Sequence, residues 1–327
     1  MWSAGSYKHQ GMMSSSADLL EKPESGRDAI AGTPQMQPRA TPAARIRLVL
    51  SYLLWPLLMI GAIAANHAGM RTAHPIFWFN VSYFSLAGLL FLFERLMPHE
   101  RQWLANDGQL VPDVGHTLLS KLAVQALVLS VGVMGAAQAV APPGAGWWPH
   151  GWPLPLQVLL GMTIAELGFY WAHRLAHERP LLWRFHAVHH SVTRLWFVNT
   201  GRFHFINTII SVAFGTGVAL AAGVPKDILI WVSAITAYVG LLTHCNVEMR
   251  FGVLNYLFNT PALHRWHHSM VRVEGDRNYG ENLMLFDLLF GTFINPNRRP
   301  PADIGISEPM PATLAAQIAH PFRRRPA

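Results

Sequence analysis

Charged residues are scarce in this chain of 327 residues: Asp, Glu, Lys and Arg make up 13%, whereas hydrophobic residues make up 51%. A soluble globular domain carries about 25% charged residues, so the composition excludes an ordinary soluble protein. The same numbers exclude disorder over the whole length, because disorder requires low hydrophobicity. Cysteine occurs once, at Cys245, which excludes an internal disulfide and a cysteine-rich metal site.

Long apolar runs take the place of the missing charges. Crossing a bilayer requires about 20 apolar residues, and six runs approach that length: 48–65, 76–93, 122–141, 156–172, 205–224 and 228–243. Only Pro225, Lys226 and Asp227 separate the last two, so we expect a helical hairpin there that either crosses the membrane or re-enters it. The sequence therefore predicts an all-α, multi-pass membrane helical bundle with four to six membrane segments.

Lysine and arginine are distributed unevenly between the apolar runs. The segments rich in them are the tail up to Arg47 with six, 173–204 with five and 248–327 with nine, whereas loops 66–75 and 142–155 and the turn 225–227 hold at most one each. The positive-inside rule therefore predicts that the N-terminus and these basic segments are cytoplasmic. This topology accounts for the excess of 25 Lys and Arg over 18 Asp and Glu, and no nucleic-acid partner is expected.

Histidine is abundant, and ten of the 17 histidines lie between residues 173 and 268. They form an H-x3-H box, two H-x2-H-H boxes and two single positions: His173 and His177; His186, His189 and His190; His264, His267 and His268; His204 and His244. Residues at i, i+3 and i+4 share one helix face, so each box directs its imidazoles at one point. A single histidine at a membrane boundary is usually a capping residue, but three such boxes indicate a metal site in a cytoplasmic helical cap.

The number and kind of these ligands restrict the metal. Neutral imidazole binds iron, zinc, copper and nickel, and eight to ten imidazoles exceed what one ion takes, so we expect two ions. Zinc would suffice for hydrolysis. An all-imidazole pair at a lipid boundary instead favours iron acting on O2 and an apolar substrate, because oxidation of an unactivated C–H bond requires a redox-active metal.

The boxes resemble those of the fatty acid hydroxylase/sterol desaturase superfamily. The resemblance rests on WAHRLAHERPLLWRFHAVHHS, TPALHRWHHS, NYGEN from Asn278 and FDLLFGTF at 286–293, and it covers residues 156–295. It implies an integral membrane, O2-dependent di-iron enzyme that hydroxylates or desaturates lipids. By position it implies metal ligands at His173, His177, His186, His189, His190, His244, His264, His267 and His268. His204 is a further expected ligand, although Phe205 follows it where the family usually has proline.

Residues near the boxes are expected to support the ligands, since a metal-bound imidazole generally donates its second N–H to a carboxylate or carbonyl. Glu166 shares a helix face with His173, and we expect it either to support the site or to be an interfacial acid. Glu248 stands where relatives carry a further histidine, and it is expected to ligate, to orient a ligand or to do neither. Asn278 is expected to orient a ligand or to cap. The other available carboxylates are Glu178, Asp276, Glu281 and Asp287, the last expected to anchor a turn.

The expected reaction is hydroxylation of a fatty acyl chain, a sterol or an aminolipid, with desaturation at the same site as the alternative and a non-catalytic metal- or sterol-binding protein less favoured. Flavin, haem and iron–sulfur signatures are absent from the sequence, so electrons are expected from a ferredoxin, a cytochrome or a reductase. The expected parts are a disordered cytoplasmic tail (1–45), N-terminal transmembrane helices (46–155), the catalytic domain (156–295) and a Pro/Arg-rich C-terminal tail (296–327).

Overall fold

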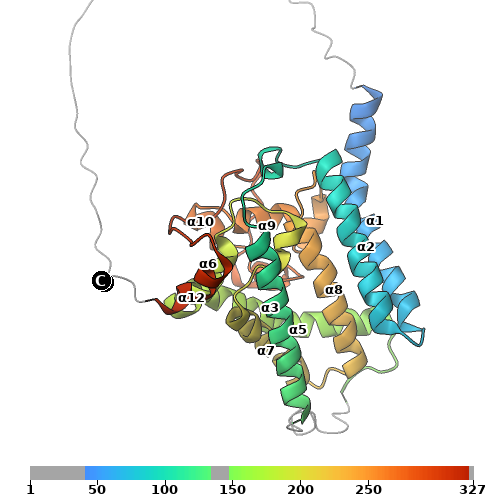
Figure 1. Ribbon diagram of the computed structural model, residues 1–327. Coiled ribbons are helices and arrows are strands. Elements are labelled where there is room, and N and C mark those ends of the chain that lie inside the picture. The colour runs from blue at the N-terminus through green and yellow to red at the C-terminus, as the bar shows by residue number, and fades with distance from the viewer. Residues whose placement is uncertain (1–40, 134–146, 324–327) are drawn as a thin grey trace, which may run out of the picture. The chain divides into compact units, whose positions relative to one another are not determined.

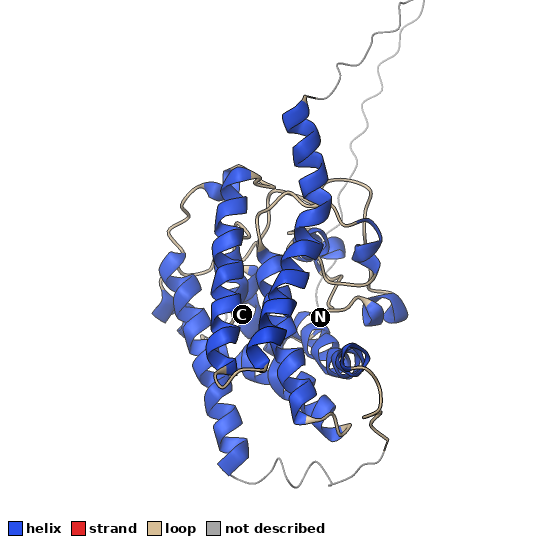
Figure 2. Ribbon diagram, turned by 90° about the vertical axis from the view of Figure 1, so that its right-hand side faces the viewer, coloured by secondary structure: helices blue, strands red, loops and turns tan. Residues whose placement is uncertain are grey.

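Helices form all the regular structure of the residues that the computed structural model describes, 41–133 and 147–323, which otherwise hold three isolated β-bridges. Figures 1 and 2 show their arrangement. The long helices are α1 (Pro42–Met70), α2 (Pro75–Leu96), α3 (Leu110–Val133), α5 (Leu154–Glu178), α7 (Phe205–Ala221) and α8 (Lys226–His244). The short ones are α6 (Pro180–His190), α9 (Pro261–His267), α10 (Arg272–Gly275), α11 (Leu285–Phe290) and α12 (Leu314–Ala319), with 3-10 turns η1 (Gln102–Leu104), η2 (Phe197–Gly201), η3 (Gly252–Tyr256) and η4 (His320–Phe322). The all-α prediction is confirmed.

Four helices in the described ranges, α1, α2, α5 and α8, are long and apolar enough to cross a membrane. They confirm the prediction of four to six membrane segments at its lower bound. Helix α7, at 17 residues, is shorter than these. The predicted run 122–141 lies in α3 up to Val133 and beyond that outside the described residues. Residues 1–40 of the predicted tail also lie outside the described residues. Exposed apolar side chains such as Ile60 and Ile76 cover α1 and α2, as lipid-facing helices require.

Helices α1, α2 and α8 run alongside one another, and α5 crosses them at a steep angle (Figure 1). The crossing of α5 with α7 is close because Gly168 has no side chain. A Cβ at Gly168 would lie 2.2 Å from the carbonyl oxygen of Phe214 on α7. Small residues allow this kind of close helix contact in membrane proteins, and here it places the histidine-bearing end of α5 beside α7.

The connection between α7 and α8 differs from the predicted hairpin. The turn is as short as expected, because α7 ends at Ala221 and α8 begins at Lys226. However, α7 packs against α5 and α3, whereas α8 packs against α1, α2 and α5. The two helices diverge from the turn because the contact with α5 at Gly168 holds α7 away from its sequence neighbour.

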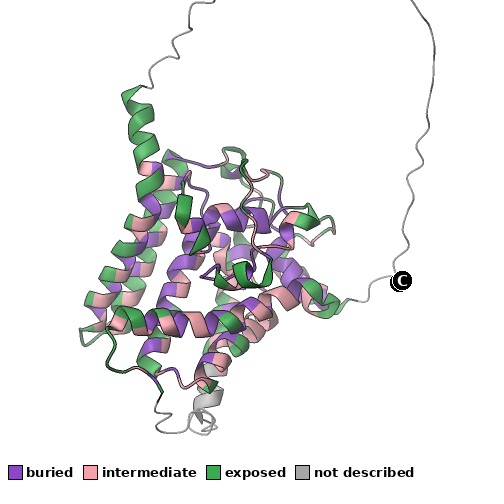
Figure 3. Cartoon of the chain, turned by 180° about the vertical axis from the view of Figure 1, so that it is seen from behind, coloured by how far each residue is buried: buried purple, intermediate pink, exposed green. Residues whose placement is uncertain are grey.

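The C-terminal segment is packed against the rest of the chain. Buried Ile304 clusters with Trp103, Val192 and Leu195. Gln317 on α12 is also buried, and its Nε2 donates to the side-chain oxygen of Gln109. Figure 3 shows that buried residues gather where α5, α6, α8 and α9 meet. The predicted histidine boxes lie on these same helices.

Candidate metal centre

Two proline residues start the helices that carry the second and third boxes. Pro180 disfavours a helical conformation at Arg179, which is extended and ends α5 at Glu178. Proline is itself favoured at the first position of a helix, so α6 begins at once and its box lies beside the box on α5. Pro261 starts α9 in the same way after the N-cap residue Thr260, whose hydroxyl accepts the backbone N–H of Leu263.

Nine of the ten predicted histidines form two buried groups. In each group the potential ligand atoms lie within 4.8 Å of one another. The five-histidine group consists of His173 and His177 from α5, His186 and His190 from α6, and His267 from α9. The four-histidine group consists of His189 from α6, His244 at the end of α8, His264 from α9 and His268 directly after α9.

Each H-x2-H-H box supplies both groups. In the α6 box the first and third histidines join the five-histidine group and the middle one, His189, joins the four-histidine group. The α9 box has the reverse arrangement, because only its middle histidine, His267, joins the five-histidine group. The two groups are therefore adjacent, and the rings of His190 and His268 stack across the boundary with centroids 4.4 Å apart.

The spacing of the imidazole nitrogens matches that of ligands around a metal ion. In the five-histidine group the Nε2 atom of His190 lies 3.1 Å from those of His177 and His186. In the four-histidine group the Nε2 atom of His264 lies 3.2 Å from that of His244 and 3.1 Å from that of His268. Two nitrogens bound at about 2.0–2.1 Å to one ion are about 2.8–3.4 Å apart at right or tetrahedral angles.

Backbone and carboxylate acceptors orient the five-histidine group. The Nδ1–H of His173 donates to the carbonyl of Tyr279 at 2.8 Å, and that of His267 donates to the carbonyl of Arg277 at 2.7 Å. The Nδ1 of His177 lies 3.1 Å from an oxygen of Asp276. Because Nδ1 carries the proton, Nε2 presents a lone pair. The buried Nε2 atoms of His173 and His267 have no hydrogen-bond partner among the described residues.

The four-histidine group has fewer such acceptors. The Nδ1 of His244 donates to the carbonyl of Gly240 at 3.2 Å. The Nδ1 atoms of His189, His264 and His268 lack a hydrogen-bond partner in the described part of the chain. His189 is instead held by Phe203, whose ring stacks on the imidazole at a centroid distance of 3.9 Å.

Burial keeps these imidazoles neutral. It lowers the pKa of six of them well below 6.5, and neighbouring imidazoles lower it further: His186, His189, His190, His264, His267 and His268. Neutral imidazole is the form that binds metal ions. The ligand-like spacing of their nitrogens and this neutral form make each group fit one metal ion.

Comparison with known proteins identifies the family. The fatty acid hydroxylase family matches residues 158–292. Ornithine lipid hydroxylase OlsE of Rhizobium tropici is 47% identical over 288 residues, which cover 86% of this chain and 87% of that protein. This chain belongs to the fatty acid hydroxylase family. It is therefore an oxidoreductase of a family of lipid-hydroxylating oxygenases.

The chain also has more distant relatives in the family, and these are monooxygenases. Methylsterol monooxygenase 2-2 of Arabidopsis thaliana is 24% identical over 225 residues, 66% of this chain and 83% of that protein. Human alkylglycerol monooxygenase is 29% identical over 148 residues, 45% of this chain and 33% of that protein, so the match spans only about a third of its length. No solved structure matches the chain.

His204, the tenth predicted ligand, lies outside both histidine groups. Its Nδ1 accepts the backbone N–H of Ile206 at 3.2 Å and thereby caps α7, and its Nε2 lies 3.2 Å from the carbonyl of Ile318. Both ring nitrogens are occupied, so His204 joins neither group. Its structural role is to connect the start of α7 to the C-terminal segment.

Glu248 and Asn278 also lie away from the two histidine groups. A carboxylate oxygen of Glu248 is 2.9 Å from Nδ1 of His99, and burial lowers the pKa of His99 to about 4. Asn278 adopts a positive φ of 54° and bonds to the backbone of Leu263 and Ile294. Neither side chain contacts an imidazole of the two groups, so Glu248 neither joins them nor orients one of their histidines.

Glu166 and Asp287 act on the site through one loop. Glu166 accepts the backbone N–H groups of Glu281 and Asn282, and Asp287 accepts those of Tyr279 and Gly280 at 2.8 and 2.7 Å. This loop carries the carbonyl that holds His173. The prediction that Asp287 anchors a turn is confirmed, and Glu166 supports the site without touching a histidine.

Sequence reasoning did not identify the acceptors at Tyr279, Arg277 and Gly240, because every residue has a carbonyl and no residue type marks the one that is used. It also missed Phe203. The one available signal was the NYG motif, whose glycine lies tightly packed. A Cβ at Gly280 would lie 2.3 Å from the carbonyl oxygen of Leu283.

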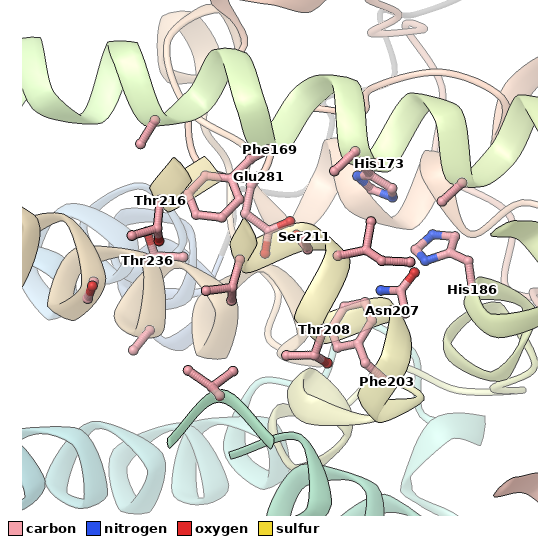
Figure 4. A pocket seen from close by; sticks show the side chains of 18 of the residues that line it. Phe169, His173, His186, Phe203, Asn207, Thr208, Ser211, Thr216, Thr236 and Glu281 are labelled. Carbon is pink, nitrogen blue, oxygen red and sulfur yellow. The ribbon is translucent and has the colours of Figure 1, made fainter. Parts of the chain in front are cut away.

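A cavity of about 390 Å³ lies between α5, α7 and α8 and reaches the five-histidine group at His173 and His186 (Figure 4). Its walls are mainly apolar, with Phe169 and Phe203 among them. Glu281 is the one carboxylate among the described residues that line it. The shape and lining suit an amphiphilic substrate whose reacting carbon faces the histidines.

Proposed function

We propose that the chain is a membrane-bound di-iron oxygenase that uses O2 to hydroxylate an ornithine lipid or a closely related aminolipid. The observation that carries this proposal is the 47% identity to ornithine lipid hydroxylase OlsE over 86% of the chain. The family membership supplies the reaction class, and this relative supplies the substrate class. The more distant relatives are named for other substrates, methylsterols and alkylglycerols.

The nine histidines of the two groups are the proposed iron ligands. Bound iron would supply the redox chemistry with O2 that oxidation of a C–H bond requires. The protein's own part is positional: the carbonyls of Tyr279 and Arg277 and the carboxylate of Asp276 keep Nε2 of their histidines directed into the five-histidine group. The apolar cavity excludes water from the reacting carbon.

The proposed organisation follows the sequence. It comprises a cytoplasmic tail (1–45), transmembrane helices (46–155), a catalytic domain (156–295) and a C-terminal segment (296–327), with the N-terminus and the site on the cytoplasmic side. The uneven distribution of lysine and arginine supports this orientation. Electrons would come from an external ferredoxin, cytochrome or reductase. Arg298 lies partly exposed over the ring of Trp266, next to His267, which offers a basic contact close to the site.

The test is turnover of a defined lipid by the full chain. Iron-loaded protein in lipid nanodiscs is supplied with ornithine lipid, O2 and a ferredoxin–reductase couple, and the lipid is analysed by mass spectrometry. We expect a product with one added oxygen atom. His264→Ala should abolish it, whereas His204→Asn, which alters a histidine outside both groups, should retain it. A product lacking two hydrogens would show a desaturase, and unchanged lipid with iron-loaded protein would overturn the proposal.

A further inference from the structure

A second cavity, of about 510 Å³, adjoins the one that reaches the histidines. The two share six lining residues: Val124, Phe203, Thr208, Thr236, Ala237 and Glu281. The second cavity extends to α2 and α3, where Tyr83 and Lys121 line it. We call the two together the joined cavity.

The joined cavity contains two opposite charges that do not pair. Glu281 lies in the shared wall and its side chain points into the cavity between Phe169 and Ser211 (Figure 4). Its carboxylate forms no hydrogen bond or ion pair within the described ranges. The ammonium of Lys121 lies 4.9 Å from the ring centroid of Tyr83, and no ion pair with a described carboxylate involves it. Charges beside apolar walls are costly unless a partner compensates them: Lys121 is exposed and has the ring of Tyr83 beside it, whereas Glu281 has no such partner among the described residues.

The wall between these charges is fixed. The hydroxyl of Thr208 donates to that of Ser120, which in turn donates to the carbonyl of Phe203, both at 3.0 Å. These bonds connect α3, which carries Lys121, to α7. On the other side, the backbone of Glu281 donates to Glu166 of α5. Lys121 and Glu281 are therefore held by separate anchors, and neither needs a ligand to keep its place.

The environment of Glu281 favours a cation as its partner. Burial raises its pKa to about 7, because the ionised form has lost water without gaining a positive partner. A sterol or a neutral lipid would leave Glu281 without a cation and Lys121 with the ring of Tyr83 alone. An anionic lipid would suit Lys121 but would oppose Glu281. A molecule that carries one ammonium and one carboxylate compensates both.

We propose that the joined cavity binds the headgroup of a zwitterionic aminolipid, with its ammonium at Glu281 and its carboxylate at Lys121. The inference rests on the proposed function, because an ornithine headgroup attached to its acyl chain through one amine retains one ammonium and one carboxylate. Glu281 and Lys121 are then specificity residues. They select the lipid by charge, and the histidines act on whichever lipid is held there.

The experiment measures equilibrium binding by the iron-loaded full chain in nanodiscs of neutral lipid. Three probes are used: ornithine lipid, its N-acetylated derivative, which lacks the positive charge, and its carboxyl methyl ester, which lacks the negative charge. We expect the wild-type chain to bind ornithine lipid about tenfold or more tightly than either derivative, because charge-assisted hydrogen bonds in a water-poor cavity are strong. Glu281→Gln should lose only the discrimination against the N-acetylated lipid, and Lys121→Gln only that against the methyl ester.

Matched controls remove the same charges elsewhere. Asp227→Asn and Lys226→Gln alter two exposed residues at the start of α8 that line neither cavity, and both should keep the wild-type discrimination. Glu281→Asp and Lys121→Arg preserve each charge and should keep it as well. If Glu281→Gln fails to fold, as shown by loss of bound iron, Lys121→Gln and the wild-type comparison still decide.

The outcomes separate the two proposals. Equal binding of all three lipids by the wild-type chain, or discrimination that survives both neutral variants, overturns the headgroup site. Discrimination by a wild-type chain that does not hydroxylate ornithine lipid supports the headgroup site and overturns the proposed function. Hydroxylation of ornithine lipid without charge discrimination supports the proposed function and overturns the headgroup site.

Discussion

The two histidine groups differ in the number of histidines and in the number of acceptors that orient them. Helix α5 supplies two histidines to the five-histidine group, whereas α8 supplies only His244 to the four-histidine group. Glu248, four residues after His244, contacts His99 instead. Three imidazoles of the five-histidine group have an acceptor for Nδ1, compared with one in the four-histidine group. We therefore expect the four-histidine group to tolerate the loss of one histidine less well than the five-histidine group does.

Substitution of one ligand on each side is the strongest way to test this difference. His264 and His267 lie one turn apart on α9 but belong to different groups. We expect His264→Ala to leave three ligands and to reduce the metal content from about two ions per chain to about one, with loss of activity. His267→Ala leaves four ligands and should retain both ions more weakly. Elemental analysis of purified protein measures this, and equal losses would contradict the comparison.

Acid should destabilise the metal-free chain through both groups alike. Each group contributes three imidazoles outside the membrane helices whose pKa lies well below 6.5 in the folded chain. In the unfolded chain they titrate near 6.5, so below this pH the unfolded state binds more protons. Stability is unaffected by them above pH 6.5 and falls as the pH drops below it, by up to about 1.4 kcal/mol per pH unit for each histidine. Thermal unfolding of metal-free protein between about pH 5 and 8 measures this, and a flat profile would contradict it.

The carboxylate partner of His177 distinguishes the groups more finely. Asp276→Asn removes the acceptor that orients this imidazole and should weaken metal binding in the five-histidine group by about 10–100-fold, leaving the other group unchanged. Competition with a metal chelator measures the affinity of each ion. Arg272→Gln is the control, because it removes only the exposed ion pair on the far oxygen of Asp276. Similar weakening in both variants would count against an orienting role.

The smallest effect is expected outside both groups. His204→Asn should leave the metal content at the wild-type level, because His204 is no ligand. Asparagine is also a good N-cap, so the loss is chiefly that of the bond to Ile318, about 1 kcal/mol of stability. Thermal unfolding and elemental analysis together measure this. A fall in metal content would restore the sequence-based prediction that His204 binds metal.

The sequence was most informative where local spacing determines geometry. The i, i+3 and i+4 spacing correctly identified nine clustered histidines, because a helix brings such positions to one face. It did not reveal that His189 and His190 face different groups, since the partners of His189 come from α8 and α9, far away in the chain, and those of His190 come from α5 and α9. His204 was mistaken for a ligand because it lies near the boxes, whereas its environment is set by the distant residue Ile318.

The membrane helices show the same limit. Hydrophobicity located α1, α2, α5 and α8, since length and composition are local properties. It could not show that α7 diverges from α8, because this depends on the close contact between Gly168 and the backbone of Phe214. Glu281 was recognised only as one available carboxylate, and its position in a cavity wall required the packing of three helices.

The division of each H-x2-H-H box between the two groups has a consequence for assembly. In the proposed two-ion site, α6 and α9 each carry ligands of both ions, so neither helix can move toward one ion without moving ligands of the other. An ion that binds first fixes both helices and so removes much of the ordering entropy that the second ion would otherwise have to overcome. Metal loading should therefore be positively cooperative, so that chains with two ions or none predominate over chains with one.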